Sequence, residues 1–368
     1  MRTLGRILAL AGLSLAFVFS IDALCFRTPF YSRILAPASS AGYFENVLAV
    51  ERKRVLPGPH RVLVCGDSQV AEGFSAKLAN QQFAQSKGWS FGSAAVSGSS
   101  VKTWYYMLRA VDPAKTRFDA IAIPFRDYAD ESQGDDAANR EVNLNMVITR
   151  LRLTDIPAFV RSFPDPAVRR QVLLGSLLKG VTYRRDLHDF LSSPKSRMRE
   201  VRFWREHGTE LLDNYPGSDK TLAGMRVNWQ TGEFYFPPQV PAEVKDAVVG
   251  RYASYILTAD QREHDYRAAA VGRILDLYRN TSVRIVFFKP PQRPLPPNLE
   301  VPETGSYVAS QIGNSRVVIL PRHAFDDMQR PEIFADGLHL NSKGRAEFSV
   351  RLASEIISAL SNGGKESP

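Results

Sequence analysis

The stretch that most constrains the fold is a short apolar run that ends in a glycine, an aspartate and a serine. Residues 62–65 read Val-Leu-Val-Cys, and Gly66-Asp67-Ser68 follows. Apolar residues at helical spacing come next, at positions 70, 74, 78 and 83. A strand, a glycine turn and a helix in this order are typical of an α/β protein. We therefore expect Ser68 near the N-terminus of a helix, where backbone N–H groups stabilise negative charge.

A serine acts as a nucleophile only when a general base takes its proton. The candidate base is His339, in the stretch Asp336-Gly337-Leu338-His339 before the last helical pattern. Each motif has an ordinary alternative, because a Gly-Asp-Ser turn also suits a capping serine and Asp-x-x-His also suits a surface loop. The two motifs together, one after the first core strand and one before the last helix, indicate a Ser-His-Asp arrangement with Asp336 as the orienting carboxylate.

These motifs resemble the first and last motifs of the SGNH (GDSL-type) hydrolase superfamily. The resemblance covers residues 62–126 and 283–361 and implies a three-layer α/β sandwich with a mostly parallel five-stranded sheet. It implies catalysis by Ser68, His339 and Asp336. It also implies that the backbone N–H groups of Ser68 and Gly98 bind the oxyanion. Gly98 alternatively serves only the turn from the second strand to the next helix.

The third motif of the superfamily, Gly-x-Asn, is replaced here by Pro124-Phe125-Arg126. This departure is similar to a branch that serves acyl transfer in the cell envelope, including the teichoic-acid D-alanylation protein and the alginate O-acetylation proteins. Arg126 is a candidate oxyanion donor in place of the asparagine. A surface arginine is the alternative reading of this residue.

The rest of the chain gives a coarse domain plan. Further strands are predicted at 90–96, 118–124, 283–288 and 317–320, and helices at 41–55, 101–111, 166–180, 183–206 and 260–279, with a closing helix whose apolar positions run from Ala346 to Leu360. An irregular loop is predicted at 207–245. The predicted domains are a signal anchor (1–25), a tether (26–58), the two parts of an SGNH-like domain (59–127 and 259–362), a largely helical, basic insertion (128–258) and a tail (363–368).

The first 25 residues differ in kind from the rest. Arg2 and Arg6 precede an apolar run from Ile7 to Leu24 that is interrupted by Asp22. No small-x-small cleavage site is evident, which favours an uncleaved membrane anchor over a cleaved signal peptide. Because the positive charges precede the apolar run, we expect the remaining chain outside the cytoplasm, in the periplasm or the extracellular space.

The net charge of +9 is concentrated in one part of the chain, since residues 140–206 contain 14 Lys or Arg and 7 Asp or Glu. Such a stretch can face anionic lipid headgroups, an acidic polysaccharide or a partner protein, and a solvated helical face is the alternative. The export signal and the lack of a binding motif exclude nucleic acid as an expected partner. Cys25 and Cys65 show no metal-type spacing, so no metal or other cofactor is expected.

The sequence thus predicts a membrane-anchored, envelope-facing serine O-acyltransferase or esterase that acts on acyl groups of a surface glycan through an acyl-serine intermediate. Its expected partners are an acyl donor and a glycan acceptor, and a membrane-bound acyltransferase is a candidate partner. The alternative is a non-catalytic protein that binds a glycan or a partner on the same fold. The missing third motif favours this alternative, whereas the intact set of Ser68, Asp336 and His339 opposes it.

Overall fold

The chain divides into two compact units. The computed structural model describes residues 2–125, 137–163, 165–253, 261–295, 308, 311 and 313–361. Unit 1 comprises Met1–Val47 and Asp135–Gly208, and unit 2 comprises Leu48–Gly134 and Thr209–Pro368. Residues 209–253, expected within the insertion, therefore belong to the same unit as the sheet.

Unit 2 contains a five-stranded parallel sheet, as predicted. Its strands are β1 (His60–Gly66), β2 (Trp89–Ala95), β3 (Ala120–Pro124), β6 (Arg284–Phe288) and β7 (Val317–Ile319). They lie in the order β2-β1-β3-β6-β7, and every neighbouring pair is parallel. The chain thus winds outward from β1 in both directions, so the carboxyl ends of β1 and β3 form the topological switch point, where α/β proteins bind ligands. Ser68 follows β1 at this point.

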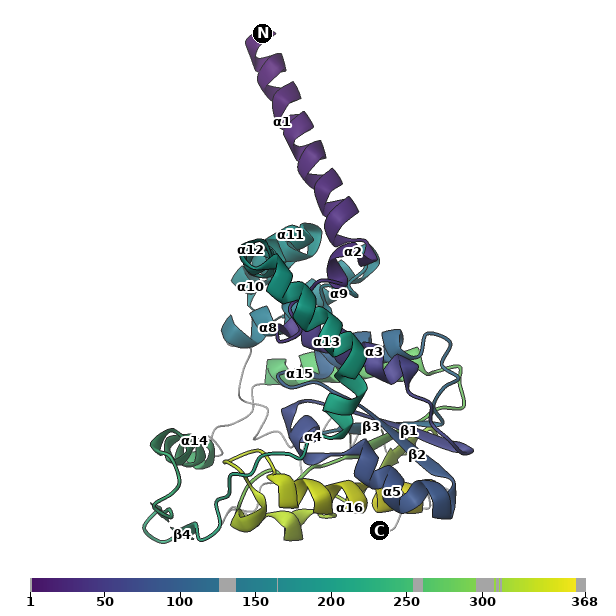
Figure 1. Ribbon diagram of the computed structural model, residues 1–368, viewed down its shortest axis with the longest axis vertical. Helices are drawn as coiled ribbons and strands as arrows, with labels where there is room; N and C mark the ends of the chain where they lie inside the picture. The colour runs from purple at the N-terminus through teal and green to yellow at the C-terminus, as the bar shows by residue number, and fades with distance from the viewer. Residues whose placement is uncertain are drawn as a thin grey trace. The chain divides into compact units, whose positions relative to one another are not determined.

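Both faces of the sheet are covered. Residues 62–66 of β1 and all residues of β3 are buried. Successive strand residues point to opposite faces, so this unbroken burial requires packing on both sides. One face packs against α5 (Ala76–Lys87) and α16 (Ser342–Ser361) through Phe83, Phe348 and Leu352. In Figure 1, α15 (Gln261–Leu277) lies on the opposite side of the sheet from α16, and it packs on α6 (Val101–Val111).

The single helix predicted after Ser68 is wrong, because the chain forms two helices there. The short helix α4 (Ser68–Gly73) ends at Phe74, whose backbone is extended. Ser75 then caps α5 by accepting a hydrogen bond from the backbone N–H of Leu78 at 3.4 Å. A Cβ on Gly73 would lie 3.3 Å from side-chain atoms of Leu340 and Phe348, so α4 packs closely on the C-terminal part of unit 2.

The prediction of an irregular loop at 207–245 is also wrong. Helix α13 (Pro194–Asp213) continues into this range, an antiparallel hairpin follows (β4, Arg226–Asn228; β5, Glu233–Tyr235), and α14 spans Ala242–Ala253. The ring of Phe234 lies 5.3 Å from that of Tyr252 on α14. Leu222, Met225 and Val248 join the buried core of unit 2. Tertiary packing therefore orders a stretch whose prolines and aromatic residues indicated a loop.

The described elements of unit 1 are helical, as predicted for the basic stretch. The predicted helix at 183–206 is interrupted at Ser193, because Pro194 begins a new helix. Among the described residues, one helix is long and apolar enough to cross a membrane, with its most apolar window at Ala9–Phe26. The elements are α1 (Arg2–Ile21), a π-helical turn η1 (Asp22–Phe26), α2 (Pro29–Ser32), the start of α3 (Ser40–Lys53), α8 (Ala137–Val147), η2 (Leu153–Asp155), α9 (Ile156–Arg161), α10 (Pro166–Leu177), α11 (Lys179–Thr182), α12 (Arg184–Ser192) and most of α13.

Gly66→Ala tests the close approach between β1 and α4. A Cβ at Gly66 would lie 2.4 Å from Val70 Cγ2 and 2.7 Å from Val70 Cβ. We expect the substitution to lower the free energy of unfolding by about 1–3 kcal/mol through overpacking. Denaturant unfolding of the detergent-solubilised chain measures this change. The control is Gly272→Ala on α15, where a Cβ meets nothing within 4 Å and a slight gain is expected. Equal denaturation midpoints for the two variants would contradict close packing between Gly66 and Val70.

Candidate active site

Ser68 lies directly after the N-cap of α4. Asp67 is the capping residue, and its Oδ1 accepts a hydrogen bond from the backbone N–H of Gln69 at 2.9 Å. The ordinary reading of this motif, a serine whose hydroxyl caps the helix, is therefore wrong. The cap is provided by the aspartate, so the Ser68 hydroxyl is available for a contact with another part of the chain.

Asp336 and His339 lie in a tight loop closed by an antiparallel bridge between Phe334 and Leu340. The backbone N–H of Ala335 donates to the carbonyl of His339 at 2.8 Å within this bridge. Asn341 follows, and its Nδ2 donates to the carbonyl of Glu332 at 3.0 Å, at a short 3₁₀ turn (η6, Pro331–Ile333). The loop is thus fixed at both ends.

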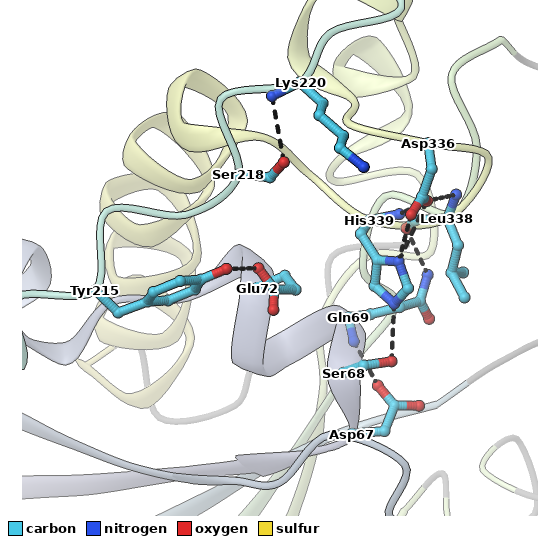
Figure 2. A network of polar contacts seen from close by, with 10 residues as sticks. All are labelled: Asp67, Ser68, Gln69, Glu72, Tyr215, Ser218, Lys220, Asp336, Leu338 and His339. Carbon is cyan, nitrogen blue, oxygen red and sulfur yellow. Dashed lines mark hydrogen bonds and ion pairs between the residues drawn. The ribbon is translucent and has the colours of Figure 1, made fainter. Parts of the chain in front are cut away.

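The three side chains form one hydrogen-bonded relay (Figure 2). His339 Nε2 lies 2.9 Å from Ser68 Oγ, and His339 Nδ1 lies 2.9 Å from Asp336 Oδ2. The expectation that Ser68 and His339 come within hydrogen-bonding distance is therefore confirmed. The side chains of His339 and Asp336 are 26% and 37% exposed, so the relay is partly open to solvent.

The surroundings of Asp336 determine which imidazole nitrogen carries the proton. Asp336 Oδ1 accepts backbone hydrogen bonds from Leu338 and His339, both at 2.8 Å. Burial by itself would raise the pKa of Asp336, but the hydrogen bond and charge of His339 and these backbone N–H groups outweigh it, so the pKa is lowered. An ionised carboxylate only accepts hydrogen bonds, which requires Nδ1 of His339 to donate. In the neutral imidazole, Nε2 then carries the lone pair that faces Ser68.

Contacts between α4 and the C-terminal part of unit 2 hold the relay together. Arg345, in the first turns of α16, donates through Nη1 to the carbonyls of Ala71 at 2.6 Å and Glu72 at 2.9 Å. Gln69 Nε2 donates to the carbonyl of Leu338 at 3.4 Å. The roles of Gln69 and Arg345 could not be predicted from the sequence. The position of Gln69 directly after Ser68 was the only signal, and nothing in the sequence pairs Arg345 with α4.

Residues 215–222 and α14 support the His339 loop from another side. The backbone N–H of Ser342 donates to the carbonyl of Ser218 at 2.7 Å. The backbone N–H of Leu222 donates to the carbonyl of Phe334 at 3.0 Å. A Cβ on Gly337 would lie 3.1 Å from the Cα of Val248 on α14. Figure 2 shows the loop segment that carries Ser218 and Lys220 passing near Asp336 and His339. These supports also escaped sequence reasoning, because their partners are distant in the chain.

The loop that carries Gly98 is tied to the end of β1. The backbone N–H of Val96 and the hydroxyl of Ser99 both donate to the carbonyl of Gly66, at 2.9 and 3.0 Å. Gly98 has a φ of +75°, a conformation that disfavours residues with a Cβ. The structure thus brings this loop to the strand end that precedes Ser68.

The end of β3 differs from the other two motifs. Pro124 has no backbone N–H, and the N–H of Phe125 donates to the carbonyl of Phe288 at 2.9 Å. Arg126 lies outside the described residues.

Neither a metal cluster nor a reactive thiol accompanies the relay among the described residues. Among the residues that the structure describes, no group of three His, Cys, Asp or Glu side chains has an arrangement that would hold a metal ion. Cys65 lies on β1 three residues before Ser68, but it is fully buried, and burial strongly raises the pKa of its thiol. A buried thiol of this kind is a poor nucleophile.

The chain matches no family model, and no curated protein matches its sequence.

Proposed function

We propose that unit 2 is a serine acyltransferase or esterase that acts on O-linked acyl groups through an acyl-serine intermediate. The observation that carries this proposal is the relay from Ser68 through His339 to Asp336 at the switch point of a parallel sheet. A hydroxyl, a base and an orienting carboxylate at these distances are what nucleophilic catalysis by serine needs.

The reaction follows from the proton positions. Ser68 Oγ attacks the acyl carbonyl and forms a C–O bond, while its proton passes to His339 Nε2. The tetrahedral intermediate then collapses, the ester C–O bond breaks, and the leaving alcohol takes the proton from His339. Asp336 stabilises the imidazolium that exists between these two transfers. Water or an acceptor hydroxyl repeats the sequence on the acyl-serine and frees Ser68.

The backbone N–H groups of Ser68 and Gly98 are the proposed oxyanion donors, and Arg126 remains a candidate third donor. The tie between the Gly98 loop and Gly66 supports this assignment, because both donors then belong to neighbouring strand ends. One such donor contributes about 2.7–4 kcal/mol to lowering the barrier. The resemblance to SGNH hydrolases, with their three-layer sandwich, is consistent with helices against both sheet faces.

A surface glycan is the proposed acyl acceptor, and the envelope is the proposed location, with unit 2 outside the cytoplasm. The apolar helix α1 supports a membrane attachment, and the arginines that precede its apolar run support the orientation. An anchored enzyme can receive an acyl group from a membrane-bound acyltransferase at the membrane surface. The basic residues between 140 and 206 would suit an anionic glycan.

Ser68→Ala tests the nucleophile. We expect the full chain to react covalently with a fluorophosphonate probe and the variant to lose this labelling, because the attacking oxygen is gone. Intact-protein mass spectrometry and probe fluorescence measure the adduct. The control is Ser192→Ala, which removes an exposed hydroxyl on α12. Undiminished labelling of Ser68→Ala would exclude Ser68, and no labelling of the unmodified chain would favour the non-catalytic alternative.

Asp336→Asn tests the orienting carboxylate. The asparagine oxygen can still accept the loop N–H groups of Leu338 and His339, so the loop is expected to persist. Its NH₂ group would face Nδ1 of His339 and favour the tautomer with the proton on Nε2, which cannot take the Ser68 proton. We expect the rate of acetyl-ester hydrolysis to fall by a factor on the order of 10⁴.

A matched control for Asp336→Asn is Asp326→Asn, because Asp326 pairs with His323 at the same sequence spacing on an exposed turn. This control should keep the activity of the unmodified chain. Equal rates for the two variants would mean that the Asp336–His339 contact has no catalytic role.

A competition experiment distinguishes transfer of the acyl group to a glycan from its hydrolysis by water. The acyl-serine partitions according to whether a bound sugar hydroxyl is positioned better than solvent, since positioning converts a bimolecular step into an effectively unimolecular one. We expect acylated glycan to exceed free acid when the full chain receives an acetyl donor and an anionic polysaccharide, as measured by mass spectrometry. Free acid as the sole product, with anionic and neutral glycans alike, would leave an esterase as the function.

A further inference from the structure

The one charged residue in the apolar window of the anchor, Asp22, belongs to the fold of unit 1. Asp22 is 3% exposed and forms an ion pair with Arg27 at 2.9 Å. Its Oδ1 accepts a hydrogen bond from the backbone N–H of Gly180 at 2.9 Å. Arg27 also donates to the carbonyls of Ser176 and Leu177. The C-terminal end of the anchor is therefore bound to the junction of α10 and α11.

Aromatic packing strengthens this connection. The ring of Phe26, at the end of η1, lies 4.9 Å from that of Tyr31 and 5.7 Å from that of Tyr183. The hydroxyl of Tyr31 donates to Asp186 on α12 at 2.8 Å. In Figure 1, α10, α11 and α12 lie beside the lower end of α1. These contacts fix the position of α10–α12 relative to the C-terminal end of the anchor.

Helix α10 has an exposed apolar face at its C-terminal end, near the anchor. Leu173, Leu174 and Leu177 are 41%, 52% and 39% exposed, whereas Val168 and Val172 on its other face are buried. Positions 173, 174 and 177 share one helix face by their spacing of three and four residues. Val181 on α11 adds a further exposed apolar side chain at 40%. We call these four residues the leucine stripe.

We infer that the leucine stripe inserts into the interfacial layer of the membrane that α1 crosses. The stripe ends at Leu177 and Val181, next to the residues that bind Asp22 and Arg27, so it lies at the level where the anchor leaves the bilayer. Exposed leucines beside basic residues are typical of helices that lie in the interface of anionic membranes. Arg170 is exposed on α10, and Arg184 and Arg185 are exposed at the start of α12, which follows α11 directly.

The inference rests on α1 as a membrane span and adds that unit 1 lies on the lipid surface through α10. A protein partner or a second copy of the chain could cover the stripe instead. The test therefore has to distinguish contact with lipid from simple loss of contact with water.

Site-directed spin labels on the full chain in nanodiscs of anionic phospholipid make this distinction. The background variant is Cys25→Ser, which leaves only Cys65, a buried thiol. A label at Leu174→Cys is compared with one at Phe203→Cys on α13, a position of matched exposure (51%). Next to Phe203, the ring of Trp204 packs against the ring of Tyr43 on α3. Helix α3 is separated from the anchor helix α1 by η1 and α2. Leu13→Cys, within α1, reports a lipid-embedded site.

We expect the label at position 174 to collide more with oxygen, which concentrates in lipid, than with a water-soluble nickel chelate. The label at position 203 should show the reverse preference, and that at 13 the strongest lipid signal. The inference is overturned if position 174 behaves like position 203, or if position 174 is shielded from both reagents, as a protein partner or a second copy would cause. A water-like signal at position 13 would overturn the anchor itself and the inference with it.

Discussion

The contact between Arg345 and the end of α4 is the constraint on which the proposed active site depends. The last carbonyls of a helix carry partial negative charge, and a guanidinium there satisfies them. Arg345 binds those of Ala71 and Glu72, one turn after Asn341 closes the His339 loop. The same few residues of the chain thus fix both the nucleophile helix and the base. Ser68 and His339 meet because α4 and the start of α16 are joined in this way.

Much of the sheet and the core of the site could be predicted from sequence. The central strands β1, β3 and β6 are buried on both faces over most of their length, so they appear as apolar runs, and Gly66, Pro124 and Pro290 mark the ends of these runs. Ser68 and His339 could be paired because one follows the first such strand and the other precedes the last helix. Both positions belong to the same edge of a parallel sheet, which makes proximity a consequence of topology rather than of local spacing.

The parts that could not be predicted are those decided by distant partners. Residues 215–253 are ordered by contacts such as Leu222 with Phe334 and Phe234 with Tyr252. The break between α4 and α5 at Phe74 follows from close packing of Gly73 on Leu340 and Phe348. Asp22 looked like an interruption of the anchor, whereas it is bound by Arg27 and Gly180. None of these pairings leaves a periodic signal in the local sequence.

The altered end of β3 bears on the proposed chemistry in a specific way. The N–H of Phe125 is used in pairing with β6 and Pro124 has none, so these two residues contribute no backbone donor to an oxyanion. Attack on the acyl-serine by water and attack by a sugar hydroxyl pass through the same kind of tetrahedral intermediate. A missing donor therefore raises both barriers alike and cannot by itself favour transfer. Selection of a sugar over water has to come from how well the acceptor hydroxyl is held beside His339 Nε2, which is a property of the acceptor site rather than of the oxyanion site.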